Sequence, residues 1–181
     1  MDRWAALFAD LEGELAAAGA AELDAEVRDR ARREVARLAL ADRLTAAVGT
    51  PLAVTTHGAG TLHGTLADAA PEWLLLADGQ RQTLVATRHV LVLDGLGPLA
   101  EEPSRTAARL TLGYALRGLA RTRAAVTVTL ADGSTVSGTF DRVGGDFAEL
   151  AEHPPGEPRR PGNVRRTRTL RLAAIAAVTS A

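Results

Sequence analysis

Residues 126–140 read Val-Thr-Val-Thr-Leu-Ala-Asp-Gly-Ser-Thr-Val-Ser-Gly-Thr-Phe, and this stretch decides the fold. Apolar and polar residues alternate on both sides of Asp132-Gly133. Alternation around an Asp-Gly pair is typical of a β-hairpin, because these residues tolerate the positive φ angles of a tight hairpin turn. The stretch therefore predicts two antiparallel strands joined at Asp132-Gly133.

An earlier stretch, residues 52–66, repeats this pattern at an offset of 74 residues. The matched pairs are Val54 and Val128, Thr55 and Thr129, Thr61 and Thr135, Gly64 and Gly138, and Thr65 and Thr139. We interpret the pair as a tandem duplication of one small β-unit. Gly64 and Gly138 are the candidate structural glycines, since a glycine in mid-strand lets the strand bend sharply.

Alternation and turn signals predict five short strands in each copy. The predicted strands lie near 52–57, 60–67, 72–77, 82–87 and 89–94, and near 125–130, 134–142, 146–151, 167–173 and 175–179. After the third strand the offset between the copies grows from 74 to 85 residues. The second copy therefore carries a proline-rich insertion, predicted as an exposed loop over residues 152–166.

Helices are predicted outside the strands. Apolar residues at helical spacing indicate one helix over 2–18, ended by Gly19, and a second over 21–47. A third is expected from Ser104, a good N-cap, to about Arg121. The first two helices either cover the β-units or form a docking hairpin for a partner or a second copy of the chain.

The predicted fold class is α+β, with N-terminal helices and two tandem five-stranded Sm-like or SH3-like β-barrels, each preceded by a helix. The expected divisions are a helical segment at 1–48, a first barrel at 49–97, a linker and helix at 98–123, and a second barrel at 124–181. Free barrel edges tend to pair with other strands. We therefore expect one internal edge pairing between the copies and burial of the uncharged strand 172–178.

Composition indicates a soluble, cytoplasmic protein. The sequence has no cysteine, which suits a reducing compartment. The first ten residues interleave charged and apolar side chains, unlike a signal peptide, and no stretch has the 18 or more apolar residues of a membrane span. All 21 basic residues are arginine, which points to a GC-rich genome, so arginine content alone does not indicate phosphate recognition.

The second copy resembles the Sm-like fold of Sm, LSm and Hfq proteins. The residues that carry the resemblance are Val126-x-Val128-x-Leu130-x-x-Gly133-x-x-Val136-x-Gly138-x-Phe140. The same alternation also suits a general SH3-like barrel, and that alternative stays open. The sequence further resembles a family of high-GC Gram-positive bacterial proteins sometimes labelled transcriptional regulators, although no helix-turn-helix pattern supports that label.

The resemblance implies an RNA pocket, but the residues expected for it are largely missing. The third strands lack the asparagine of RNA-binding Sm proteins, and the junction between the last two strands is apolar in the second copy. Only Arg88 and His89, at the corresponding junction of the first copy, are polar enough to hold a nucleotide. A shared fold does not transfer a site.

The best candidate site is the insertion. Residues 159–181 hold six arginines and no acidic residue. The candidate nucleic-acid-binding residues are Arg159, Arg160, Arg165, Arg166 and Arg168, together with Arg88 and His89. Arginines on a stiff loop neutralise phosphates and give salt-dependent, sequence-independent binding to RNA or DNA.

Other chemistry finds little support. The four histidines lack cysteine or a spaced carboxylate partner, so no metal site is predicted. No serine lies in a Gly-x-Ser-x-Gly elbow, and we expect no cofactor and no enzyme activity. The expected function is a nucleic-acid-associated or regulatory binding protein. The alternative is an interaction or assembly module that joins a second copy or another protein through its helices and barrel edges.

Overall fold

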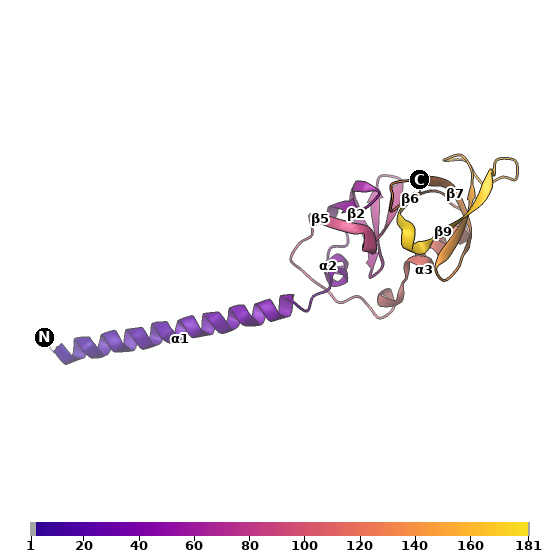
Figure 1. Ribbon diagram of the computed structural model, residues 1–181. Helices are drawn as coiled ribbons and strands as arrows, with labels where there is room; N and C mark the ends of the chain where they lie inside the picture. The colour runs from indigo at the N-terminus through magenta and orange to yellow at the C-terminus, as the bar shows by residue number, and fades with distance from the viewer. Residues whose placement is uncertain (1–2, 181) are drawn as a thin grey trace. The chain divides into compact units, whose positions relative to one another are not determined.

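A computed structural model describes residues 3–180, which fall into two compact units divided between Ala39 and Leu40. The first unit contains α1 (Arg3–Val35), one continuous helix of 33 residues (Figure 1). The predicted helix end at Gly19, and with it the helical hairpin, is therefore wrong. One glycine costs a helix only about 1 kcal/mol relative to alanine, and the alanines on both sides of Gly19 favour the helix.

The second unit contains ten strands in one antiparallel sheet. The first five are β1 (Pro51–Thr56), β2 (Gly60–Ala70), β3 (Trp73–Asp78), β4 (Arg81–Ala86) and β5 (Val90–Asp94). The other five are β6 (Ala125–Leu130), β7 (Thr135–Val143), β8 (Phe147–Glu152), β9 (Arg166–Arg171) and β10 (Ile175–Ser180). All ten predicted strands are confirmed, with ends that differ by up to three residues.

The prediction of two closed five-stranded barrels is wrong. The strands form one open sheet in the order β5-β1-β2-β3-β4-β10-β6-β7-β8-β9. Short 3-10 helices, η1 (Thr87–His89) and η3 (Leu172–Ala174), separate β4 from β5 and β9 from β10. The outer edge of β4 pairs with β10, from Ala177 opposite Val85 to Ser180 opposite Gln82, and we call this pairing the central join. Because the central join occupies these edges, neither group of five strands closes on itself.

The strand order within the two groups is the same, since β5-β1-β2-β3-β4 matches β10-β6-β7-β8-β9. The central join confirms the predicted internal edge pairing. Duplication of the sequence stays an interpretation. The predicted hairpin at Asp132-Gly133 is also confirmed, with Val128 opposite Val136. Gly133 has φ +85°, and Asp132 accepts hydrogen bonds from the backbone and hydroxyl of Ser134.

Gly138 in β7 marks a close approach between backbones. A Cβ atom at this position would lie 2.1 Å from the carbonyl oxygen of Ala151. At Gly64 in β2 the corresponding distance, to the carbonyl oxygen of Ala77, is 2.9 Å. The strands bulge two to four residues later, between Phe140 and Arg142 and between Leu66 and Asp68. Both glycines therefore lie where a side chain would push neighbouring strands apart.

One helix precedes each group of five strands and contributes to its core. Leu44 of α2 (Leu40–Ala46) is buried among Val54, Leu66 and Leu74. Leu112 and Leu116 of α3 (Leu112–Thr122) belong to a second cluster, which contains Phe140 and Ile175. The third predicted helix begins later than expected, because Ser104 caps only a short turn and Thr111 is the N-cap of α3.

Candidate nucleic-acid interface

The loop between β8 and β9, residues 153–165, is anchored by a buried histidine. His153 is only 2% exposed, and its Nε2 lies 2.8 Å from the hydroxyl oxygen of the fully buried Thr139. Its Nδ1 lies 3.0 Å from the carbonyl oxygen of Pro154. A carbonyl oxygen only accepts, so Nδ1 carries a proton in this contact, and in the neutral imidazole Nε2 then accepts from the Thr139 hydroxyl.

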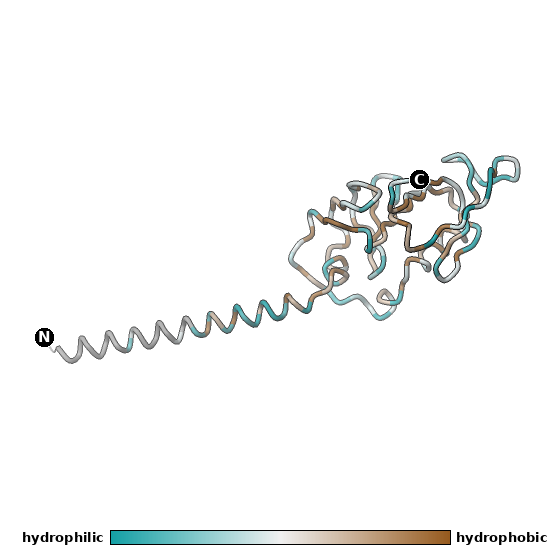
Figure 2. The backbone as a smooth tube through the Cα atoms, viewed as in Figure 1, coloured by the Kyte–Doolittle hydropathy of each residue, from teal (hydrophilic) through white to brown (hydrophobic). Residues whose placement is uncertain are grey.

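Asn163 gives the outer part of the loop its shape. Its Oδ1 accepts a hydrogen bond from the backbone N–H of Arg160 at 2.9 Å. Its Nδ2 donates to the carboxylate of Glu157 at 3.1 Å and to the carbonyl oxygen of Pro158 at 2.9 Å. The segment is hydrophilic, in agreement with its teal colour in Figure 2. One amide thus holds together both ends of the arginine-bearing turn.

Glu152, the last residue of β8, binds two of the predicted arginines. The Nε atoms of Arg166 and Arg168 both lie 2.7 Å from its Oε2. These two residues are two apart on β9 and so share one face of the sheet. Hydrogen bonds from Arg166 and Arg168 lower the pKa of the Glu152 carboxyl to about 2. The carboxylate therefore holds two guanidinium groups and leaves one positive charge in excess.

The other loop arginines differ in their pairing. Arg159 forms an ion pair with Asp141, with 2.9 Å between Nε and Oδ1. Arg160 and Arg165 are exposed, and no acidic side chain among residues 3–180 forms an ion pair with either. The structure therefore places two unpaired cations beside three that share two carboxylates.

Arg88 and His89 lie elsewhere, on η1 between β4 and β5. The Nε2 of His89 lies 2.9 Å from the carbonyl oxygen of Ala173 on η3, so the imidazole is already engaged. Arg88 lines a cavity together with Arg171. Arg171 is the last residue of β9, whereas Arg166 is the first. A six-residue strand is about 17 Å from its first Cα to its last. The predicted site residues therefore lie in two separate places. Five arginines lie in or next to the loop between β8 and β9, and Arg88 and His89 lie on η1.

Two residues of this cavity, Glu72 and Arg117, had no signal in the sequence as parts of a site. They come from the β2–β3 turn and from α3, and only the folded chain brings them near Arg88. Within the part of the chain that the structure describes, no group of three or more histidine, aspartate or glutamate side chains is placed to hold a metal ion. No helix in that part is long and apolar enough to cross a membrane.

The sequence matches no protein-family model and no curated protein. The resemblance to Sm-like proteins therefore stays a prediction.

Proposed function

We propose that the protein is a non-enzymatic binding protein that holds nucleic-acid backbones through the loop between β8 and β9. The observation that carries the proposal is the pair Arg160 and Arg165, exposed and free of ion pairs within the described residues, on a loop whose shape is fixed by Asn163. Guanidinium groups bind phosphate oxygens with two parallel hydrogen bonds. An ordered loop loses less conformational entropy on binding than a flexible one.

The ion pairs limit how many phosphates the loop neutralises. Arg159, Arg160, Arg165, Arg166 and Arg168 lie beside Asp141, Glu152 and Glu157, so the group has two positive charges in excess. Each neutralised phosphate contributes about 0.9 to the slope of log K against log salt for duplex DNA. We therefore expect the loop to account for a slope of about two, less than its five arginines suggest.

No aromatic side chain belongs to the loop, which favours contact with phosphates over base stacking. Among the side chains that the structure describes, the exposed aromatic ones are Tyr114 on α3 and Phe147 at the start of β8, with exposed fractions of 50% and 37%. Stacking on aromatic rings is the usual way to hold single-stranded bases. The proposal is therefore binding to the backbone with little sequence preference.

The test is fluorescence anisotropy with labelled single-stranded RNA and duplex DNA over a range of salt concentrations. The double variant Arg160→Ala, Arg165→Ala should reduce the slope by about two units. Glu152→Gln should bind more tightly, because it removes the carboxylate that competes for Arg166 and Arg168. Arg121→Gln, at the end of α3, is the matched control for loss of charge. Absence of binding by the native chain at low salt would overturn the proposal.

A second candidate function is assembly with another copy of the chain. The outer strands of the sheet are β5 and β9, and each has one paired edge and one free edge. On β5, Leu91 is 63% exposed and Val92 is 50% exposed. A free edge with apolar side chains favours pairing with a further strand, and the central join shows that the equivalent strands β4 and β10 pair within one chain.

Analytical ultracentrifugation distinguishes this candidate. Assembly through β5 requires that the mass rise with protein concentration and that Leu91→Lys return the chain to the mass of a monomer. A monomer at all concentrations would contradict assembly and leave nucleic-acid binding as the only candidate.

A further inference from the structure

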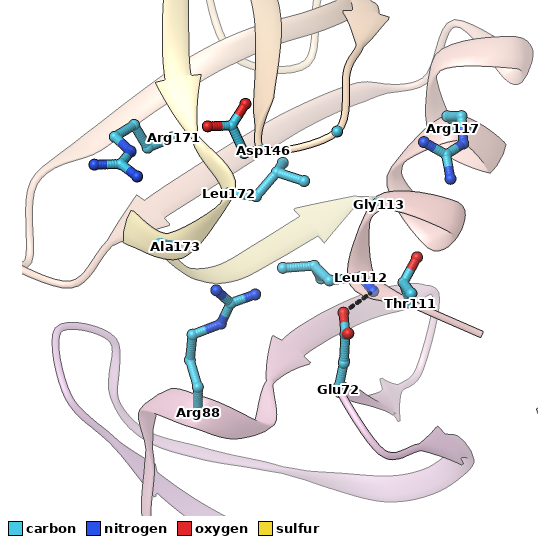
Figure 3. Close-up of a pocket in the computed structure, with 11 residues that line it drawn as sticks. Glu72, Arg88, Thr111, Leu112, Gly113, Arg117, Asp146, Arg171, Leu172 and Ala173 are labelled. Atoms are coloured by element: carbon cyan, nitrogen blue, oxygen red, sulfur yellow. Dashed lines mark hydrogen bonds between the residues drawn. The ribbon is translucent and has the colours of Figure 1, made fainter. Parts of the chain in front are cut away.

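A cavity of about 340 Å³ lies where the two groups of strands meet α3 (Figure 3). Its walls are formed by the β2–β3 turn at Glu72, by η1 at Arg88, by the first turns of α3, by the β7–β8 turn at Asp146 and by the segment from Arg171 to Ala173. It is separate from the loop site, because Arg171 and Arg166 are at opposite ends of β9.

Three arginines from three elements line this cavity: Arg88 on η1, Arg117 on α3 and Arg171 on β9. None of them forms an ion pair or a side-chain hydrogen bond with another described residue, unlike Arg142, Arg159, Arg166 and Arg168. Figure 3 shows Arg88 reaching from η1 toward Ala173 and Arg117 turning back toward the start of α3. The guanidinium group of Arg117 lies next to Gly113: a Cβ there would be 3.6 Å from Nη1, an ordinary contact distance.

The acidic residues of the cavity neutralise these arginines only in part. Glu72 accepts a hydrogen bond from the backbone N–H of Leu112 at 2.8 Å, so its carboxylate already serves the start of α3. Asp146 is the second carboxylate of the lining. Three guanidinium groups against two carboxylates leave an excess of positive charge, and the helix terminus is already occupied by protein groups. The cavity is therefore suited to an anion held by arginine side chains.

Hydrogen bonds between distant segments fix the walls. His89 on η1 is bound to the carbonyl oxygen of Ala173, and the N–H of Leu172 donates to the carbonyl oxygen of Asp146 at 2.8 Å. The indole N–H of Trp73 donates to the carbonyl oxygen of Leu110 at 3.1 Å, next to α3. The backbone segments that carry the three arginines are thus held in place before a ligand arrives, which lowers the entropic cost of binding.

We propose that this cavity binds the phosphate monoester group of a small molecule. A monoester carries about 1.5 to 2 negative charges at pH 7, whereas each phosphodiester of a nucleic acid carries one. Three arginine side chains around one cavity suit the more highly charged group. The volume is at the lower end of the range for small-molecule sites, which leaves space for a sugar-sized remainder.

Isothermal titration calorimetry with ribose 5-phosphate, ribose and inorganic phosphate tests the proposal on the full chain. Ribose 5-phosphate should bind one to one and ribose should not bind. Arg88→Gln, Arg117→Gln and Arg171→Gln should each weaken binding by about 10-fold, as expected for the loss of a hydrogen bond to a charged group. Arg121→Gln, one turn further along α3, and the loop variant Arg160→Ala, Arg165→Ala should bind like the native chain.

All the substituted side chains are exposed, so we expect each variant to fold. Circular dichroism and thermal melting check this. Absence of ribose 5-phosphate binding at millimolar concentration would overturn the proposal. An equal loss of affinity for ribose 5-phosphate in Arg121→Gln would also overturn it, because the loss would then reflect the net charge of the protein and not the cavity. Displacement of ribose 5-phosphate by an oligonucleotide without terminal phosphates would assign the cavity to nucleic acid instead.

Discussion

Val178 of β10 lies opposite Leu84 of β4 in the central join, and both side chains are buried in one apolar cluster. The strand that contains Val178 also pairs with β6, where Val178 lies opposite Val128. The two groups of strands therefore share core residues as well as backbone hydrogen bonds.

Val178→Ala tests this shared core. The substitution removes two buried carbon atoms, and we expect the free energy of unfolding to fall by about 2 kcal/mol. Denaturant unfolding of the β-sheet, followed by circular dichroism, should show one transition at lower denaturant concentration. Leu99→Ala, at a position 74% exposed, should change the free energy of unfolding by less than about 0.5 kcal/mol. Two separate transitions, of which only one moves, would contradict the shared core.

Gly138→Ala tests the close backbone approach in β7. The new Cβ would meet the carbonyl oxygen of Ala151 at 2.1 Å and a methyl group of Leu150 at 2.9 Å. We expect a loss of about 3 kcal/mol in the free energy of unfolding, because strand pairing must shift to make room. The matched control is Gly145→Ala, where no atom lies within 4 Å of the new Cβ. Similar stability of the two variants in urea titrations would show that the close approach of the β7 and β8 backbones does not require glycine at position 138.

Thr139→Val tests the anchor of the loop. Valine has nearly the same shape but cannot donate to Nε2 of His153, which would then be buried without its partner. We expect a loss of about 1–3 kcal/mol, measured by urea unfolding. At Thr127, whose hydroxyl bonds the half-buried Ser137, the same substitution should cost less. A larger loss at Thr127 than at Thr139 would rule out this account of the anchor.

Glu152→Gln tests the ion pairs of β8 and β9 through their pH dependence. Folding lowers the pKa of this carboxyl from 4.5 to about 2, so the unfolded chain binds the proton more tightly. The stabilisation is therefore complete above the ordinary value of 4.5 and is lost as the pH falls from there toward 2. The native chain should be more stable than Glu152→Gln at neutral pH, and the difference should shrink over this range.

The same comparison has a control in salt concentration. Added salt should reduce the stability difference at neutral pH, because both arginines are partly exposed and their charges are screened. A difference that grows as the solution is acidified would contradict the proposed role of the carboxylate.

The sequence predicted the strands well because alternation and turn residues are local signals. It also predicted that one pair of free edges would join between the copies, but not that this join would leave one open sheet, since β4 and β10 are about ninety residues apart and edge pairing depends on both groups of strands. The error at Gly19 has a different cause: one glycine is a weak stop signal among strong helix formers.

The candidate site was predictable in part. The arginines of residues 159–168 stand out by their density in the sequence. The pairing of Arg159 with Asp141 was not visible, because the loop brings Arg159 to Asp141 only in the folded chain. The cavity was harder still to predict, as Arg88, Arg117 and Arg171 belong to three elements and none of them marks a motif.

The position of β10 has a consequence for how the protein is made. It is the last of the ten strands to leave the ribosome, yet it lies between β4 and β6 in the middle of the sheet. Until residues 175–180 emerge, β4 and β6 each expose an unpaired edge, and such edges promote association between nascent chains. The sheet is therefore completed in one late step, when β10 inserts between β4 and β6. Chaperones that shield open strand edges would matter most just before this insertion.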